Sequence, residues 1–229
     1  QSRWQLQQGI LYYAHRNVLY VDEINLLDEE IVNCILDAAS RGYYVVRRGR
    51  LIGTFTSEFL LIGSMNPEEG ALRPQLMDRL GLRVVVAPVQ SPEQRLEVYE
   101  RNRNFADDPV TFAAGYAEET MTLADEIAEA KEMLPEVTIP PQIAEPAMKL
   151  INSLQVRSHR AEIVLLEASR ARAAADGRKE VESADIAVVA PLALRQRRSD
   201  FMERFMKESI KEDDRIAGGV KKVLGIEKR

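Results

Sequence analysis

The strongest constraint on the fold comes from two short apolar runs that each stop abruptly at polar residues. Residues 18–21 read VLYV and are followed by Asp22 and Glu23, whereas residues 59–63 read FLLIG and lead to Asn66. Short, continuously apolar runs with such boundaries are typical of buried strands in a parallel sheet. The sequence therefore predicts an α/β sheet with polar side chains gathered where its strands end.

A helix and a hairpin are expected between these two strands. Acidic residues 28–30 open a segment with apolar residues at helical spacing, and Gly42 closes it. Cys34 lies on this segment and is expected to be a small core residue. Residues 43–46 and 51–56 are rich in β-forming types and predict a hairpin with a basic turn. The basic residues of this turn are Arg47, Arg48 and Arg50.

The second half of the chain is expected to be helical. Residues 83–87 predict a third strand, but strand patterns vanish after residue 91, where we place a domain boundary. A long acidic helix through residues 123–134 precedes a proline-containing linker at 135–141. The helices expected beyond this linker span residues 142–154, 160–176 and 183–195.

Composition excludes several classes of protein. With 45% apolar residues the chain can build a packed core, and its net charge of -5 lacks the basic footprint of a dedicated nucleic-acid binder. Its single cysteine allows neither an internal disulfide nor a thiolate metal cluster. We find no signal peptide and no membrane span, so we expect a cytoplasmic protein, or a plastid stroma protein in a phototrophic eukaryote.

The polar residues after the two strands suit nucleotide hydrolysis. Asp22 can bind Mg²⁺ through its waters, and Glu23 can orient or deprotonate the attacking water. In the alternative interpretation both carboxylates cap the following turn. Asn66 can place its amide beside a γ-phosphate and hold the water, although Asn-Pro is also a common turn.

Three arginines are candidates for phosphate contacts. Arg79 at a subunit edge can stabilise negative charge in a neighbour's transition state, or it can form an ordinary surface salt bridge. Arg73 has the same two interpretations, with the structural one favoured. Arg160 begins an expected helix and either reaches a nucleotide from a lid or is solvated.

Two blocks of sequence closely resemble the ATPase I subunit of magnesium chelatase. They are LYVDEINLLD at residues 19–28 and GSMNPEEGALRPQLMDRLGL at residues 63–82, and the second is long and highly specific. The resemblance covers most of the chain and fades after residue 199. It implies an AAA+ P-loop NTPase core of α/β type, followed by an all-α helical lid bundle.

The resemblance also implies a role for each candidate residue. Asp22 and Glu23 become the Walker B pair, with Asp22 holding the Mg²⁺ of MgATP through water. Asn66 becomes sensor 1, Arg79 the arginine finger and Arg160 sensor 2. ATP and Mg²⁺ are the implied cofactors.

The resemblance divides the chain into four segments. They are a partial AAA+ core at 1–90, a linker with an inserted helix at 91–141, a lid at 142–198 and a charged tail at 199–229. The implied assembly is a homo-oligomeric ring, a hexamer, with Arg79 completing a neighbour's site. The implied partners are a second AAA+ subunit with an integrin-like domain and a large porphyrin-binding catalytic subunit.

The implied function is the ATP-hydrolysing motor that drives Mg²⁺ insertion into protoporphyrin IX, an ATP-dependent ligase reaction that forms N–metal bonds. A cobalt chelatase motor is a close variant. A MoxR-type chaperone that remodels or metallates a protein partner would share every residue above. A nucleic-acid motor is disfavoured by the acidic charge. Arg47, Arg48 and Arg50 either line the pore of such a ring or remain solvated.

One expected motif is missing. A phosphate-binding loop of the form G-x-x-x-x-G-K-[ST] occurs nowhere in the sequence, and the family places it upstream of Walker B. We therefore expect an N-terminally incomplete fragment that binds ATP weakly or not at all as it stands. The alternative is a scaffold that never binds ATP, although its hydrolytic carboxylates and arginines are intact.

Overall fold

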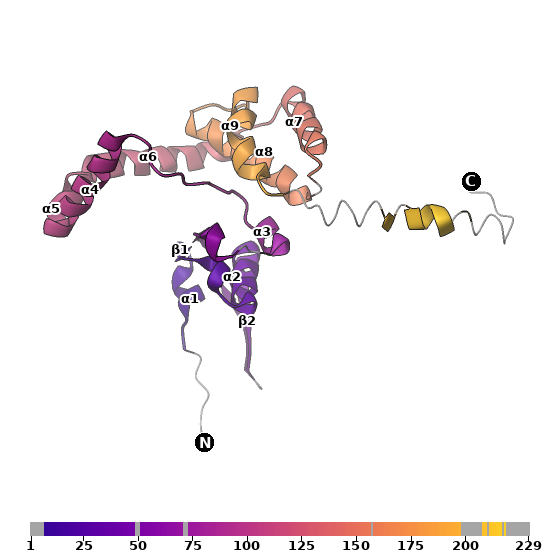
Figure 1. The fold of residues 1–229 in the computed structure, drawn as a ribbon, viewed down its shortest axis with the longest axis horizontal. Helices are drawn as coiled ribbons and strands as arrows, with labels where there is room; N and C mark the ends of the chain where they lie inside the picture. The colour runs from indigo at the N-terminus through magenta and orange to yellow at the C-terminus, as the bar shows by residue number, and fades with distance from the viewer. Residues whose placement is uncertain are drawn as a thin grey trace, which may run out of the picture. The chain divides into compact units, whose positions relative to one another are not determined.

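The chain forms two compact units, Gln1–Leu80 and Gly81–Arg229. The four-part division that the sequence suggests stays a prediction. The computed structural model describes residues 7–48, 51–70, 73–156 and 158–197, together with 208–209, 211–216 and 218. Most of the expected tail at 199–229 lies outside these residues. Each unit is described by itself (Figure 1).

A pair of parallel strands organises the first unit. β1 (Val18–Val21) pairs with β4 (Leu60–Gly63), and Val21 lies opposite Gly63. Both runs form parallel strands as predicted, but the expected burial is wrong for one face of the pair. Leu19, Val21 and Leu61 pack into the core, whereas the other face is open, with Val18, Tyr20, Leu60 and Ile62 each at least 46% exposed. Because the strands run in the same direction, the residues that follow them meet at the same edge of the sheet.

Helix α2 (Glu29–Arg41) supplies the core against which this sheet packs. Its residues Val32 and Leu36 are buried in one cluster with Ile24 and Leu76. The helix ends at Gly42, whose φ of 73° is the left-handed conformation that glycine tolerates best. The short helices of this unit are α1 (Ile10–Ala14), η1 (Ile24–Leu26), η2 (Pro67–Glu69) and α3 (Pro74–Arg79).

The expected burial of Cys34 is wrong, because this residue is exposed. The buried positions of α2 are Val32, Ile35, Leu36 and Ala38. At 100° per residue, position 34 lies roughly 160° around the helix from both Val32 and Leu36, so it points away from the centre of this face. An apolar residue type did not by itself establish which face would be buried.

The predicted hairpin is confirmed. β2 (Tyr43–Arg48) and β3 (Leu51–Thr56) pair antiparallel, with Tyr43 opposite Thr56. The rings of Tyr44 and Phe55 stack across the two strands with centroids 5.5 Å apart. Arg47 is exposed, whereas Arg50 and the side chain of Arg48 lie outside the described residues.

The third strand expected at residues 83–87 is not formed. A strand needs a neighbour that takes up its backbone N–H and C=O groups. The N–H of Arg83 instead donates to the carbonyl oxygen of Leu192 at 2.9 Å. Val84, Val85 and Val86 are 71%, 64% and 89% exposed, so this apolar run has no ladder partner among the described residues.

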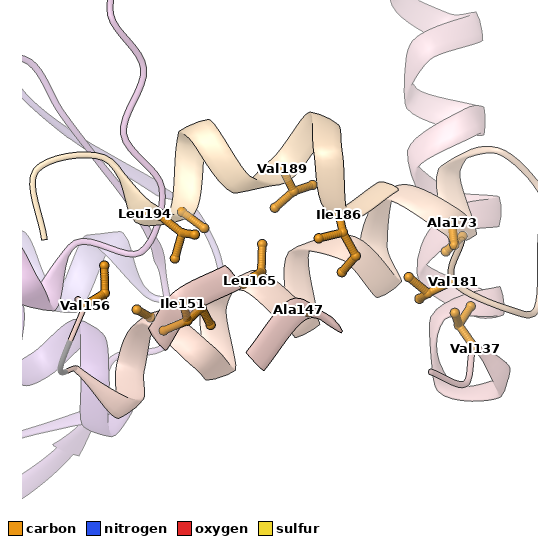
Figure 2. Close-up of a cluster of buried hydrophobic side chains, with 13 residues drawn as sticks. Val137, Ala147, Ile151, Val156, Leu165, Ala173, Val181, Ile186, Val189 and Leu194 are labelled. Atoms are coloured by element: carbon orange, nitrogen blue, oxygen red, sulfur yellow. The ribbon is translucent and has the colours of Figure 1, made fainter. Parts of the chain in front are cut away.

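The helical lid forms the core of the second unit. It consists of α7 (Pro141–Ser153), α8 (His159–Ala175) and α9 (Ser183–Leu194), close to the bounds expected from the sequence. Figure 2 shows how the side chains of these helices meet, with Leu165 at 0% exposure and Ile151 at 1%. The lid is therefore held together by apolar packing.

Three further helices lead into this lid. They are α4 (Pro92–Asp107), α5 (Pro109–Ala114) and α6 (Ala117–Met133), and η3 (Leu134–Glu136) follows them. Of these three helices, α6 packs against α8, and α4 and α5 lie toward the other end of α6 (Figure 1). Across the described ranges, no helix is both long and apolar enough to cross a bilayer.

We expect Leu165→Ala to lower the free energy of unfolding of the lid by about 3 kcal/mol, because it leaves a cavity in a fully buried site. Leu154 is 47% exposed, so Leu154→Ala is the matched control and should cost less than about 1 kcal/mol. Urea unfolding followed by circular dichroism measures both. Equal losses for the two variants would contradict the assigned core.

Candidate active site at the strand ends

The residues that follow β1 and β4 are joined by backbone hydrogen bonds. The N–H of Ser64 donates to the carbonyl oxygen of Val21 at 3.0 Å, and the N–H of Ile24 donates to that of Ser64 at 3.0 Å. These bonds continue the parallel pairing beyond the strands themselves. We call Asp22, Glu23, Ser64 and Asn66 the strand-end cluster.

Two hydroxyl groups hold the carboxylate of Asp22. The hydroxyl of Tyr20 donates to Asp22 Oδ1 at 3.0 Å, and the hydroxyl of Ser64 donates to the same oxygen. The Ser64 bond, followed by the Tyr20 bond, holds the pKa of Asp22 below its ordinary value. Asp22 is exposed and ionised at neutral pH, as a ligand of a hydrated cation must be.

Glu23 has an unusual backbone conformation. Its φ of 48° and ψ of 49° lie in the left-handed region, which costs a residue with a side chain roughly 1–2 kcal/mol. Its N–H donates to Ser64 Oγ at 3.0 Å, which stabilises this conformation. Because strained backbone often occurs at functional sites, the strain agrees with a role for the exposed Glu23 carboxylate.

The side chain of Asn66 makes a local turn. Its Oδ1 accepts a hydrogen bond from the N–H of Glu68 at 3.2 Å and thereby caps η2. Asn25 Nδ2 approaches the Asn66 carbonyl oxygen at 3.5 Å and donates to that of Gly70 at 3.2 Å. Asn66 is exposed, and its sensor role stays a prediction.

Helix α3 is tied to α2 by two arginines. Arg79 Nη1 lies 2.5 Å from Asp37 Oδ1, and Arg73 Nη1 lies 2.7 Å from Glu29 Oε2. All four side chains are at least 32% exposed, and exposed pairs of this kind contribute about 0–1 kcal/mol. Arg79 can therefore give up its partner for a stronger anion, and its finger role stays a prediction.

Arg160 belongs to the second unit. It lies in the first turn of α8 and is exposed, next to His159, whose Nδ1 is 3.0 Å from Glu162 Oε2. The two units are described separately, so the position of Arg160 relative to the strand-end cluster is not tested. Its role as sensor 2 stays a prediction.

The strand-end cluster fits Mg²⁺ that arrives with a nucleotide. In the part of the chain that the structure describes, no group of three His, Cys, Asp or Glu side chains could hold a metal by itself. Mg²⁺ is usually held by one or two carboxylates, several waters and substrate phosphates. One ionised, exposed aspartate at a sheet edge matches that pattern.

Three comparisons with known proteins bear on this site. A model of the AAA lid domain matches residues 145–217. The chain is 36% identical to the magnesium-chelatase subunit ChlI of Chlorella vulgaris, over 96% of this chain and 61% of that protein. It is 42% identical to the magnesium-chelatase 38 kDa subunit of Acidiphilium rubrum, over 83% of this chain and 55% of that one.

A solved structure agrees with the fold. A protein of Cytophaga hutchinsonii that is named as an ATPase superposes with a TM-score of 0.58 at 20% identity, over 79% of this chain and 58% of that one. Together, the sheet, the lid and these matches define a partial AAA+ ATPase core followed by its helical lid.

Within that class, the chain is a relative of the I subunits of magnesium chelatase. The resemblance seen in residues 19–28 and 63–82 is thereby confirmed. The chain spans 61% of the Chlorella protein and 55% of the Acidiphilium protein.

Sequence reasoning missed three residues that organise the site, namely Tyr20, Asn25 and Ser64. Tyr20 was counted only as part of an apolar strand, although its hydroxyl reaches Asp22. Ser64 had a usable signal, because it is the first polar residue after the second strand and parallel pairing brings it next to Asp22. Asn25 had no comparable signal, because its bonds depend on the loop after Asn66.

We expect Asp37→Asn to lower the free energy of unfolding by less than about 1 kcal/mol, because the ion pair with Arg79 is exposed. Leu36→Ala, on the buried face of the same helix, should cost about 2–5 kcal/mol. Chemical unfolding of the two variants measures both values. A loss for Asp37→Asn as large as that for Leu36→Ala would show that the ion pair is structural and that Arg79 is not available to a neighbour.

Proposed function

We propose that the full reading frame containing this chain encodes the ATP-hydrolysing motor subunit of a magnesium-chelatase-like complex. The proposal rests mainly on one observation: Asp22, Glu23 and the segment before Asn66 lie together at one edge of a parallel sheet. The similarity to chelatase I subunits supports it. In open α/β sheets this edge is where ligands bind.

Each residue has a separate task in this mechanism. Asp22 binds the waters of Mg²⁺, which supplies charge neutralisation to the phosphates, and Glu23 orients the attacking water and accepts its proton. Asn66 holds that water through its amide. Arg79 of one subunit stabilises the charge that develops in its neighbour's site, and Arg160 contacts the nucleotide from the lid.

We propose that the subunits form a hexameric ring and act on two other subunits. The ring is supported by the exposed Arg79, because its own ion pair is weak enough to exchange for a neighbour's phosphate. The proposed partners are a second AAA+ subunit with an integrin-like domain and a large subunit that binds the porphyrin. This chain supplies the motor, and the large subunit supplies the porphyrin site.

The chelatase assay tests the whole proposal. The full-length protein, mixed with both partner subunits, protoporphyrin IX, Mg²⁺ and ATP, should form magnesium protoporphyrin, which its fluorescence reports. ATP turnover without metal insertion in this mixture would favour the MoxR-type chaperone instead. Salt-sensitive binding to DNA would favour a nucleic-acid motor.

Glu23→Gln in the full-length protein should abolish steady-state ATP turnover, with a loss of about 10²-fold or more, because the amide cannot accept a proton. ATP affinity should stay close to that of the wild type, since Gln keeps the size of the side chain. Phosphate release and equilibrium ATP binding measure the two effects. Normal turnover by this variant would refute the role of Glu23.

Arg79→Ala should also stop turnover while leaving ring assembly intact, because the arginine acts in the neighbouring site. Mixing Arg79→Ala subunits with Glu23→Gln subunits should then restore part of the activity, since some junctions combine an intact Glu23 with an intact Arg79. The control is each variant alone at the same total concentration. Absence of any rescue in mixed rings would argue that Arg79 acts within its own subunit.

A further inference from the structure

The side chain of Ser64 is hydrogen-bonded to both acidic residues of the strand-end cluster. Ser64 Oγ accepts a hydrogen bond from the N–H of Glu23 at 3.0 Å. A hydroxyl has one proton, and that of Ser64 is donated to Asp22 Oδ1. A single side chain is therefore bonded to both residues of the carboxylate pair, from a different strand.

The backbone of Ser64 adds two further constraints. Its N–H donates to the carbonyl oxygen of Val21 at 3.0 Å, and its carbonyl oxygen accepts from the N–H of Ile24 at 3.0 Å. Glu23 is thus bracketed, because its own N–H and the next N–H along the chain both donate to Ser64. These two bonds hold Glu23 on both sides of its left-handed backbone conformation, which has a φ of 48°.

We propose that Ser64 is a positioning residue of the ATPase site, which fixes the Asp22 carboxylate toward hydrated Mg²⁺ and the Glu23 carboxylate toward the attacking water. This inference rests on the proposed ATPase function and goes beyond it by assigning a task to a residue that acts through Asp22 and Glu23. Misplacement of a catalytic group by about 1 Å can cost on the order of 10²-fold in rate.

If Ser64 had a purely structural role, its loss would lower stability and not activity. The first unit contains a matched serine for comparison. Ser57 is 0% exposed and its hydroxyl donates to the carbonyl oxygen of Leu11 at 2.6 Å. Ser64 is only half-buried, and its side-chain partners Asp22 and Glu23 are exposed. Loss of the Ser57 hydroxyl should therefore reduce stability more than loss of the Ser64 hydroxyl.

The test compares Ser64→Ala with Ser57→Ala in the full-length protein. Ser64→Ala should lower kcat for ATP about tenfold or more, and its KM for MgATP should rise in step with the loss of Mg²⁺-dependent affinity. Isothermal titration with a non-hydrolysable ATP analogue gives a second readout. The gain in affinity on adding Mg²⁺ should shrink about tenfold, while affinity in EDTA stays unchanged. Ser57→Ala should lower Tm and change none of these quantities.

Conservative variants separate the hydroxyl from the space it fills. Ser64→Thr keeps the hydroxyl and should restore kcat and the Mg²⁺-dependent affinity to within about threefold of the wild type. Ser64→Cys keeps the shape with a much weaker hydrogen-bonding group, so it should reproduce the loss and can replace Ser64→Ala if that variant does not fold.

Two failures can be told apart. Wild-type values for both kcat and the Mg²⁺-dependent gain in Ser64→Ala would overturn the role of Ser64 and leave the ATPase function standing. A threonine variant as defective as the alanine variant would also overturn it. A wild-type protein that neither hydrolyses ATP nor binds the analogue would instead overturn the proposed function, and this inference with it.

Discussion

The parallel pairing of β1 with β4 is the constraint on which the strand-end cluster depends. Because Val21 lies opposite Gly63, the next residues of both strands emerge side by side. The bonds of Ser64 to Val21, Asp22, Glu23 and Ile24 then fix the turn after β1. A shift of one residue in this register would move Ser64 to the other face of the sheet and separate it from both carboxylates.

Packing around α2 connects this edge to the arginines. The buried face of α2 holds the sheet, and Asp37 and Glu29 on the same helix hold Arg79 and Arg73. The apolar contacts are the strong part of this arrangement, and the exposed ion pairs are the weak part. Such a division suits the proposed role of Arg79, in which its guanidinium would exchange Asp37 for a phosphate in the neighbouring subunit.

The sequence predicted the strands, α2, the hairpin and the lid because each has a clear hydrophobic period and clear end signals. It failed at residues 83–87, where three valines resemble a strand but the N–H of Arg83 bonds to Leu192. It also failed at Cys34, whose residue type says little about the helix face. The candidate carboxylates were found because they follow strands, whereas Ser64, which also follows a strand, was recognised from the register and its hydrogen bonds.

The most direct test is the specific ATPase activity of the full-length protein, measured across a range of protein concentrations. If ATP is hydrolysed by the strand-end cluster and completed by Arg79 from a neighbour, activity per subunit should rise with concentration and then reach a plateau as the ring forms. Activity per subunit that is zero throughout, or constant down to concentrations at which the protein is monomeric, would contradict the account.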